Sequence, residues 1–142
     1  METSKGPVVI ELEPQLAPKH VARIKQLTSQ GFYDGLLFHR VIEGFMAQTG
    51  DPKGNGTGGS GQKLAAEIST ARFTRGTVGM ARGQSFDSAD SQFFICFKDC
   101  SFLNGQYTIW GQVTQGMENV DKLARGEPPR SPDKIVKMTV QQ

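Results

Sequence analysis

The chain has 142 residues and a formal net charge of +2 at pH 7, with acidic and basic residues interspersed along its length. This length is typical of a single domain with one continuous hydrophobic core, here residues 1–142. The sequence contains no basic run interleaved with aromatic residues, which argues against a nucleic-acid partner, and no apolar stretch of membrane-spanning length.

The predicted elements begin with a strand over residues 8–12, after a turn at Lys5-Gly6. A helix is predicted over 18–30, because apolar residues recur at three-residue spacing between Pro18, which suits a first turn, and Gly31, which suits a stop. Short strands follow over 37–42, 45–48, 77–81, 93–97 and 108–113. A second helix over 117–125 ends before Gly126, and a last strand covers 135–140. Many short strands separated by turn residues favour a barrel or a sandwich.

A glycine-rich stretch over residues 54–61 invites comparison with a phosphate-binding loop. Such a loop needs Lys-Ser or Lys-Thr after its last glycine and a strand that runs into a helix, whereas Gln62-Lys63 follows here. We therefore favour a surface loop in which the glycines allow positive φ angles.

Cys96 and Cys100 are too few for a disulfide framework, and with only His20 and His39 in the chain a zinc site is disfavoured. Four extended residues would place the two Cα atoms roughly 13 Å apart, beyond the ~7 Å limit for a disulfide, and only a turn at Cys100 would shorten this. We expect two free thiols. His39 lies in an apolar strand, where a hydrogen-bonded structural histidine is favoured over a partner for a cysteine nucleophile. The serines of 85–91 lack the strand-to-helix elbow of a serine hydrolase.

Residues 1–12 lack the apolar segment of a signal peptide, so we expect a cytoplasmic location, or a periplasmic one if a signal peptide has been removed.

Several residues fit both a core and a pocket. For Arg40, spacing alone favours a surface salt bridge, and Phe45 and Phe94 would each be assigned to the core in isolation. Gln48 and Gln92 lie in otherwise apolar strands, where a buried amide needs a hydrogen-bond partner. Composition alone does not separate the two alternatives.

Two longer motifs resemble the signatures of the cyclophilin family. FHRVIEGFMAQ, at residues 38–48, is similar to that family's FHRVI-GFM-Q pattern, and SQFFI, at 91–95, is similar to its second signature. The order and spacing of Gly50-Asp51, the glycine-rich stretch and residues 79–81, 102–105 and 111–113 also follow the family, so the resemblance spans essentially the whole chain.

The resemblance implies a mainly β fold, a closed eight-stranded antiparallel barrel capped by two α-helices. It also implies a peptidyl-prolyl cis/trans isomerase that acts on X-Pro bonds of peptides and folding proteins. No cofactor or metal is expected for such an enzyme. The expected partners are proline-containing peptides and unfolded protein chains, and the expected state is a monomer.

Carried over position by position, the resemblance implies that Arg40 is the catalytic arginine. The residues implied to hold the proline ring are Phe45, Met46, Phe94 and Leu103. The other implied substrate-binding residues are Gln48, Ala81, Arg82, Gln92, Phe102 and Tyr107, of which Ala81 and Arg82 would offer backbone groups to an extended peptide.

The chain departs from the better-known eukaryotic members of the family. Phe102 and Tyr107 stand where those have tryptophan and histidine, Arg82 where they have asparagine, and Thr49 where they have glycine. These features resemble bacterial members and predict weak cyclosporin binding. Only about four residues precede the Lys5-Gly6 turn, so the family's first strand is either clipped or Met1 is not the natural start.

The alternative function is a non-catalytic module that binds proline peptides, or a chaperone-like holdase. Retention of Arg40 argues against it, because binding alone does not require that arginine.

Overall fold

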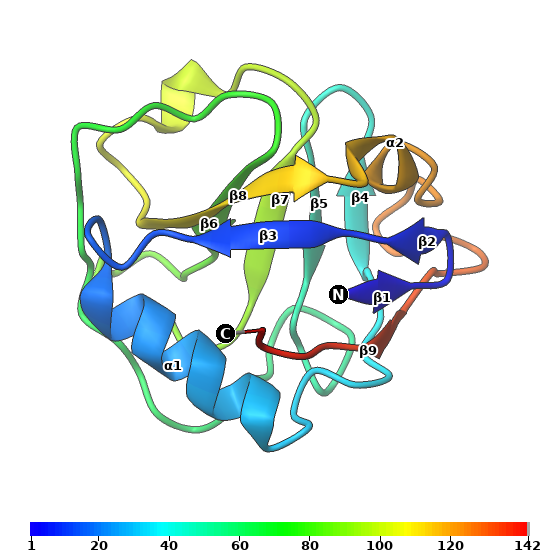
Figure 1. Ribbon diagram of the computed structural model, residues 1–142, viewed down its shortest axis with the longest axis horizontal. Coiled ribbons are helices and arrows are strands. Elements are labelled where there is room, and N and C mark those ends of the chain that lie inside the picture. Colours follow the sequence, from blue (N-terminus) through cyan, green and yellow to red (C-terminus); the bar gives the residue numbers. More distant parts are fainter. Residues whose placement is uncertain (142) are drawn as a thin grey trace.

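The computed structural model describes residues 1–141 and places all seven predicted strands and both predicted helices, with ends that differ by a few residues (Figure 1). Two further short strands lie at the N-terminus, and a 3-10 turn, η1, covers Ser101–Leu103. The strands are β1 (Glu2–Thr3), β2 (Gly6–Pro7), β3 (Val9–Leu12), β4 (Arg40–Ile42), β5 (Met46–Thr49), β6 (Thr77–Met80), β7 (Phe93–Cys96), β8 (Ile109–Gln115) and β9 (Ile135–Lys137). The helices are α1 (Pro18–Ser29) and α2 (Met117–Val120).

The fold is mainly β with two helices, as the resemblance implied, and the strands form two sheets, so a closed barrel of eight strands is not confirmed. A six-stranded antiparallel sheet has the order β3-β8-β6-β7-β5-β4, and a three-stranded sheet has the order β2-β1-β9. The division falls at Val8, which is buried between β2 and β3 and whose N–H donates to the Met1 carbonyl, so the chain leaves one sheet and enters the other there. The N-terminal strand β1 pairs with β9 through only two residues, Glu2 and Thr3.

The central strands of the large sheet are buried on both faces. Successive side chains of a strand point to opposite faces, so Ala47 of β5 and Ile95 of β7 belong to the main core, which also contains Ile24 of α1. Their neighbours Met46 and Phe94 belong to a second apolar cluster. Burial on both faces removes the alternation of polar and apolar residues that would have distinguished a core from a pocket in the sequence.

Helix α1 begins at Pro18 as predicted, but its N-terminal cap comes from a distant loop. Ala17, at the N-cap position, has no side-chain hydrogen bond to the helix. The Glu67 carboxylate accepts hydrogen bonds from the backbone N–H groups of Lys19, at 3.1 Å, and His20, at 2.8 Å. This carboxylate satisfies two of the N–H groups that every helix start leaves unpaired.

Helix α2 is shorter than the predicted span of 117–125. The backbone N–H of Ala124 donates to the Asp133 side chain at 2.8 Å, which removes it from helical pairing. The guanidinium of Arg125 donates to the carbonyls of Asp121 and Leu123. Side chains therefore satisfy the groups that a longer helix would have paired.

Two predicted strands are also shorter than expected, because backbone N–H groups near their ends donate to acceptors outside the sheet. In the 37–42 stretch, Phe38 donates its N–H to the Asp133 carbonyl at 2.8 Å and only residues 40–42 pair with β5. In the 135–140 stretch, the N–H of Met138 donates to the Asp34 carboxylate at 2.9 Å, just beyond the end of β9.

The glycine-rich stretch is organised by two carboxylates of the protein itself. Asp51 accepts hydrogen bonds from backbone N–H groups of residues 53, 55 and 56, and Asp90 accepts them from residues 60 and 61. A Cβ atom at Gly58 would lie 2.1 Å from Asp51 Oδ1, and one at Gly59 would lie 2.5 Å from Asp90 Oδ2. Glycines are therefore required so that these carboxylates can approach, and the N–H groups that a phosphate would need are occupied.

The prediction for His39 was partly wrong. The side chain is buried as expected, but within residues 1–141 neither ring nitrogen meets hydrogen-bonding geometry with a protein partner. The Leu37 carbonyl and the Gln92 side chain lie near the ring, and the Leu37 carbonyl also accepts a hydrogen bond from Thr49 Oγ1. Burial lowers the pKa of His39, and burial likewise lowers that of His20 despite its contact with Glu67.

We predict that the free energy of unfolding falls in two steps as the pH is lowered from about 7.5 to about 3. Below the ordinary histidine pKa of 6.5, the unfolded chain binds protons at His20 and His39 that the folded chain still excludes. A second step follows below the ordinary aspartate pKa of 3.8. Burial alone would raise the pKa of Asp51, but the backbone hydrogen bonds to its carboxylate outweigh burial and lower it.

Urea unfolding across this pH range is the measurement. The variant Asp51→Asn, compared over the same range, should show a smaller second step because it has one fewer carboxylate to protonate. A free energy of unfolding that stays constant over the whole range would contradict the prediction.

Candidate active site

One row of residues crosses four strands of the large sheet and forms the base of the candidate site. Arg40 of β4 lies opposite Gln48 of β5, Gln48 lies opposite Phe94 of β7, and Phe94 lies opposite Gly79 of β6. Directly paired residues of neighbouring strands point to the same face. The register of the sheet therefore brings together residues that are up to 54 positions apart in the chain.

A continuous chain of polar side chains runs along this row. Arg40 Nε donates to Glu127 Oε1 at 2.7 Å and Arg40 Nη1 donates to Gln48 Oε1 at 3.2 Å. Gln48 Nε2 donates to Gln92 Oε1 at 2.9 Å, and Gln92 Nε2 donates to the Gly58 carbonyl at 2.9 Å. Gln48 in β5 and Gln92, just before β7, thus both have hydrogen-bond partners, and the guanidinium is held from two sides.

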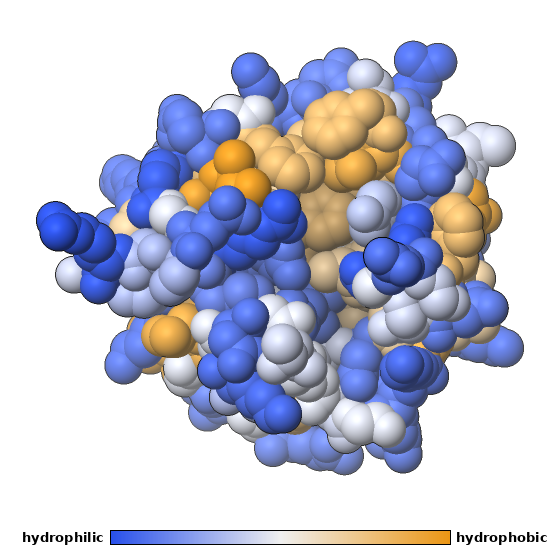
Figure 2. All heavy atoms as spheres, turned by 180° about the vertical axis from the view of Figure 1, so that it is seen from behind, coloured by the Kyte–Doolittle hydropathy of each residue, from blue (hydrophilic) through white to orange (hydrophobic). Residues whose placement is uncertain are grey.

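A pocket of about 120 Å³, lined by apolar and polar side chains, lies beside the guanidinium. Figure 2, which shows the molecule from behind the view of Figure 1, has apolar surface gathered around a hollow. Phe94 packs between Phe73, whose stacked ring is 5.8 Å away, and Tyr107, whose ring meets it edge-on at 5.8 Å. The pocket is lined by Arg40, Phe45, Met46, Gln48, Ala81, Arg82, Phe94, Leu103 and Tyr107, all of which the sequence predicted for the site.

Two predicted residues lie outside this lining. Gln92 lines a larger neighbouring pocket and reaches the first one only through its hydrogen bond to Gln48. Phe102 is 69% exposed on η1, with its ring centroid 5.4 Å from that of Phe45. The structure thus places Phe102 beside the pocket and in contact with one of its walls.

The Arg82 side chain lines the pocket and also makes contacts with two aromatic rings and with backbone carbonyls. Its guanidinium carbon lies 4.1 Å from the ring centroid of Phe86 and 4.4 Å from that of Tyr107. It also donates to the carbonyls of Gln106, at 2.8 Å, and Gly83, at 2.9 Å. Arg82 therefore joins the loop that follows β6 to the segment before β8.

Sequence reasoning missed Glu127. This residue lies 87 positions from Arg40, in a turn after Gly126, and its carboxylate is 56% exposed. No local pattern marks it, because only the closure of the chain around β4 brings it to the arginine.

The two cysteines are free and buried in the second apolar cluster, directly beneath the pocket. The estimate of 13 Å for their separation does not apply, because β7 ends at Cys96 and the chain turns before Cys100, whose Sγ donates to the Phe45 carbonyl at 3.6 Å. Burial raises the pKa of both thiols.

We predict that thiol titration of the unfolded, non-reduced protein finds two free thiols. In the native protein both should react much more slowly, because the thiolate is the reactive form and burial disfavours it. Finding no free thiol after unfolding would contradict the prediction.

Within residues 1–141 there is no helix long and apolar enough to cross a membrane. The same residues contain no group of three or more His, Cys, Asp or Glu side chains placed to hold a metal ion.

Comparison with known proteins agrees with the resemblance seen in the motifs. The profile of the family "Cyclophilin type peptidyl-prolyl cis-trans isomerase/CLD" matches residues 1–140. A Brucella suis protein named "Probable peptidyl-prolyl cis-trans isomerase" is 52% identical, over 99% of this chain and 81% of its own length. A Helicobacter pylori peptidyl-prolyl cis-trans isomerase is 40% identical, over 89% of this chain and 80% of its own length.

A solved structure is similar over nearly the whole chain. The Cryptosporidium parvum cyclophilin-type isomerase, determined in the presence of the dipeptide Ala-Pro, matches with a TM-score of 0.91 and 29% identity, over 99% of this chain and 96% of that one. With a matched family profile, closely related isomerases and a shared fold, the chain belongs to the cyclophilin-type peptidyl-prolyl cis-trans isomerase family and is an isomerase of X-Pro bonds.

Proposed function

We propose that this isomerase acts through Arg40 on X-Pro bonds of peptides and of folding protein chains. The observation that carries the proposal is the position of the Arg40 side chain, which is 43% exposed and lies at the edge of a pocket with aromatic and aliphatic walls, where Glu127 and Gln48 hold its guanidinium in place. A guanidinium has five N–H donors, and only two of those on Arg40 are engaged in these bonds, so donors remain for a substrate.

The chemistry follows from the electronic structure of the peptide bond. The nitrogen lone pair is delocalised into the carbonyl, which gives a rotation barrier of about 18–20 kcal/mol. As the bond twists, the lone pair localises on the prolyl nitrogen. A donor from Arg40 to that nitrogen therefore binds the twisted amide and not the planar one, which is the condition for catalysis.

One hydrogen bond from Arg40 to the prolyl nitrogen is not sufficient to account for a large rate gain. A hydrogen bond from a charged group contributes roughly 1.5–3 kcal/mol, whereas a rate gain of about 10⁵ requires about 7 kcal/mol. Two further contributions come from the pocket. Phe45, Met46, Phe94 and Leu103 hold the proline ring while the preceding residue turns, and an apolar environment disfavours the more charge-separated planar amide.

A proline-isomerisation assay on a short X-Pro peptide tests the proposal against the alternative of a non-catalytic binding module or chaperone. Exchange between the cis and trans peaks of the peptide should accelerate on addition of the protein. Binding without accelerated exchange would support the alternative.

The remaining properties of the protein are proposals of the same kind. We propose a monomer that binds proline-containing peptides and unfolded chains and neither nucleic acid nor membrane, in keeping with the small net charge of +2. A cytoplasmic location fits two free cysteines that lie close together, because an oxidising compartment favours disulfides.

We also propose that the two sheets act as one closed barrel. The single residue between β2 and β3 joins them on one side, and the bridge between Leu37 and Lys134 joins them on the other.

We predict weak cyclosporin binding, which Phe102→Trp should strengthen. The exposed Phe102 ring offers no N–H, so a ligand carbonyl that a tryptophan would satisfy loses its partner, at a cost of about 1–3 kcal/mol. Titration calorimetry of both proteins is the measurement. Tight binding by the wild type, with no gain in the variant, would contradict the prediction.

A further inference from the structure

A second pocket opens directly beside the pocket next to Arg40 that is proposed to hold the proline ring, here called the proline pocket, and it is the larger of the two. Its cavity volume is about 490 Å³, and it shares Gln48, Ala81 and Arg82 with the lining of the proline pocket. Since a chain advances at most ~3.3–3.6 Å per residue, the occupant of a contiguous pocket belongs to a residue close to the proline. The polar chain from Arg40 through Gln48 and Gln92 to the Gly58 carbonyl forms the boundary between the two pockets.

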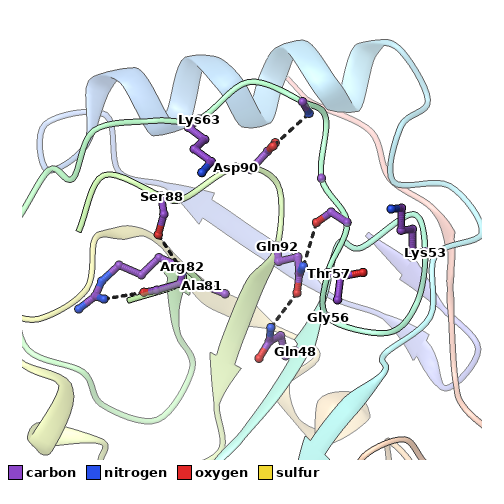
Figure 3. A pocket seen from close by; sticks show the side chains of 14 residues that line it. Gln48, Lys53, Gly56, Thr57, Lys63, Ala81, Arg82, Ser88, Asp90 and Gln92 are labelled. Atoms are coloured by element: carbon purple, nitrogen blue, oxygen red, sulfur yellow. Dashed lines mark hydrogen bonds between the residues drawn. The ribbon is translucent and has the colours of Figure 1, made fainter. Parts of the chain in front are cut away.

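The charges around this second pocket are unbalanced. Lys53 and Lys63 line it, and Figure 3 shows them on opposite sides of the cavity. Neither ammonium group has an ion-pair partner among residues 1–141. Both side chains belong to exposed residues, so each can turn toward a bound group.

The one acidic residue in the lining, Asp90, is already engaged. Its carboxylate accepts hydrogen bonds from Ser60 N, at 2.8 Å, Ser60 Oγ, at 2.6 Å, and Gly61 N, at 3.0 Å. Arg23 Nη1 lies 3.9 Å from the same carboxylate and offsets its charge. Asp51, behind the glycine-rich stretch, is likewise bonded to backbone N–H groups. These bonds orient both carboxylates without cancelling their charge, and neither aspartate forms a described ion pair with Lys53 or Lys63.

Arg82 adds a third positive charge at the boundary between the pockets. Among the described contacts its partners are carbonyl oxygens and two aromatic rings, and none of them is a carboxylate. A neutral or basic side chain in this cavity would leave the positive charges uncompensated, whereas a carboxylate would be attracted by all three.

We propose that the second pocket selects substrates that carry an aspartate or glutamate within about three residues of the proline, with Lys53 and Lys63 as the specificity-determining residues. This inference rests on the proposed function, because the proline pocket must hold the proline for the neighbouring pocket to receive an adjacent side chain.

The experiment compares pairs of short peptides that differ only in glutamate or glutamine, placed in turn at each of the three positions on either side of the proline. For each pair, NMR exchange gives kcat/KM with three proteins: the wild type, Lys53→Gln/Lys63→Gln, and the charge-matched control Lys122→Gln/Lys137→Gln. The two control lysines are exposed, line neither pocket and form no described ion pair.

At one position or more, the wild type should prefer the glutamate peptide by about three- to tenfold, as expected for two partly exposed ion pairs. The preference should vanish in Lys53→Gln/Lys63→Gln, persist in the control, and weaken with added salt. A glutamate preference at no position, or one of equal size in Lys53→Gln/Lys63→Gln, would overturn the proposal.

A binding readout separates this inference from the proposed function. The backbone amide signals of Gly58, Gly59 and Gly61 are followed while the same glutamate and glutamine peptides are titrated. If these signals shift more with the glutamate peptide, and only when both lysines are present, the second pocket selects acids even if no peptide is isomerised. Equal shifts with both peptides would overturn the inference even if isomerisation is fast.

Discussion

Replacing Arg40 with alanine should leave the protein folded and slow X-Pro isomerisation at least about tenfold, because ~1.4 kcal/mol of transition-state binding is already worth that factor. The guanidinium is half exposed and its ion pair with Glu127 lies at the surface, so its removal leaves no buried cavity. We expect the free energy of unfolding to change by no more than about 1–2 kcal/mol. Peptide binding should weaken less than turnover, because the proposed hydrogen bond forms chiefly as the amide twists.

Arg40→Lys is the matched variant that keeps the charge. It should not restore full activity, because an ammonium group lacks the planar set of donors that engages Glu127, Gln48 and the substrate together. The decisive measurement is exchange between cis and trans peptide peaks at saturating enzyme. If Arg40→Ala is folded and exchanges the peptide as fast as the wild type, the proposed mechanism is wrong.

Replacing Gly79 with alanine should damage both stability and substrate binding. A Cβ atom at this position would lie 2.7 Å from Phe73 Cε1 and 2.7 Å from Phe94 Cζ, on strand β6 in the middle of the sheet. Overpacking of this kind costs typically 1–3 kcal/mol. Phe94 lines the pocket beside Arg40, so a displacement of its ring alters the candidate site, and KM should rise more than kcat falls.

Two further variants test whether the effect of Gly79→Ala on KM comes from the aromatic rings. Gly35→Ala places a Cβ atom with nothing within 4 Å, but at a φ of +83°, so it should lose stability through backbone strain while KM stays unchanged. In the Gly79→Ala background, Phe73→Leu removes one of the two clashing rings and should recover part of the affinity for the peptide. A normal KM for Gly79→Ala would contradict the prediction.

Much of the architecture was accessible from local sequence patterns. The strands and helices could be predicted because turn residues separate the short apolar runs, and because Pro18 and Gly31 bracket the helical spacing between them. The errors lie at the ends of elements, where side chains compete for backbone groups. Asp133 is the clearest case, since it takes the Ala124 N–H that a longer α2 would have used.

The candidate site residues were predicted from the resemblance of the whole chain to a known family, which two motifs and the spacing of shorter segments carry, and not from periodicity. Periodicity failed for a physical reason. Strands β5, β6 and β7 are buried on both faces, so Met46 and Phe94, which line the pocket, are as apolar as Ala47 and Ile95, which fill the core. No alternation of residue types distinguishes one face from the other.

The sequence by itself therefore determined the family and the order of the elements, because these are properties of local motifs and spacing. Only the tertiary structure decided how distant groups meet. Glu127 pairs with Arg40 across 87 residues, Glu67 caps α1 across 47, and Asp90 organises the glycine-rich stretch across 30. Charged groups of this kind carry no local signal, because what each one does depends on the group that the fold places within hydrogen-bonding distance of it.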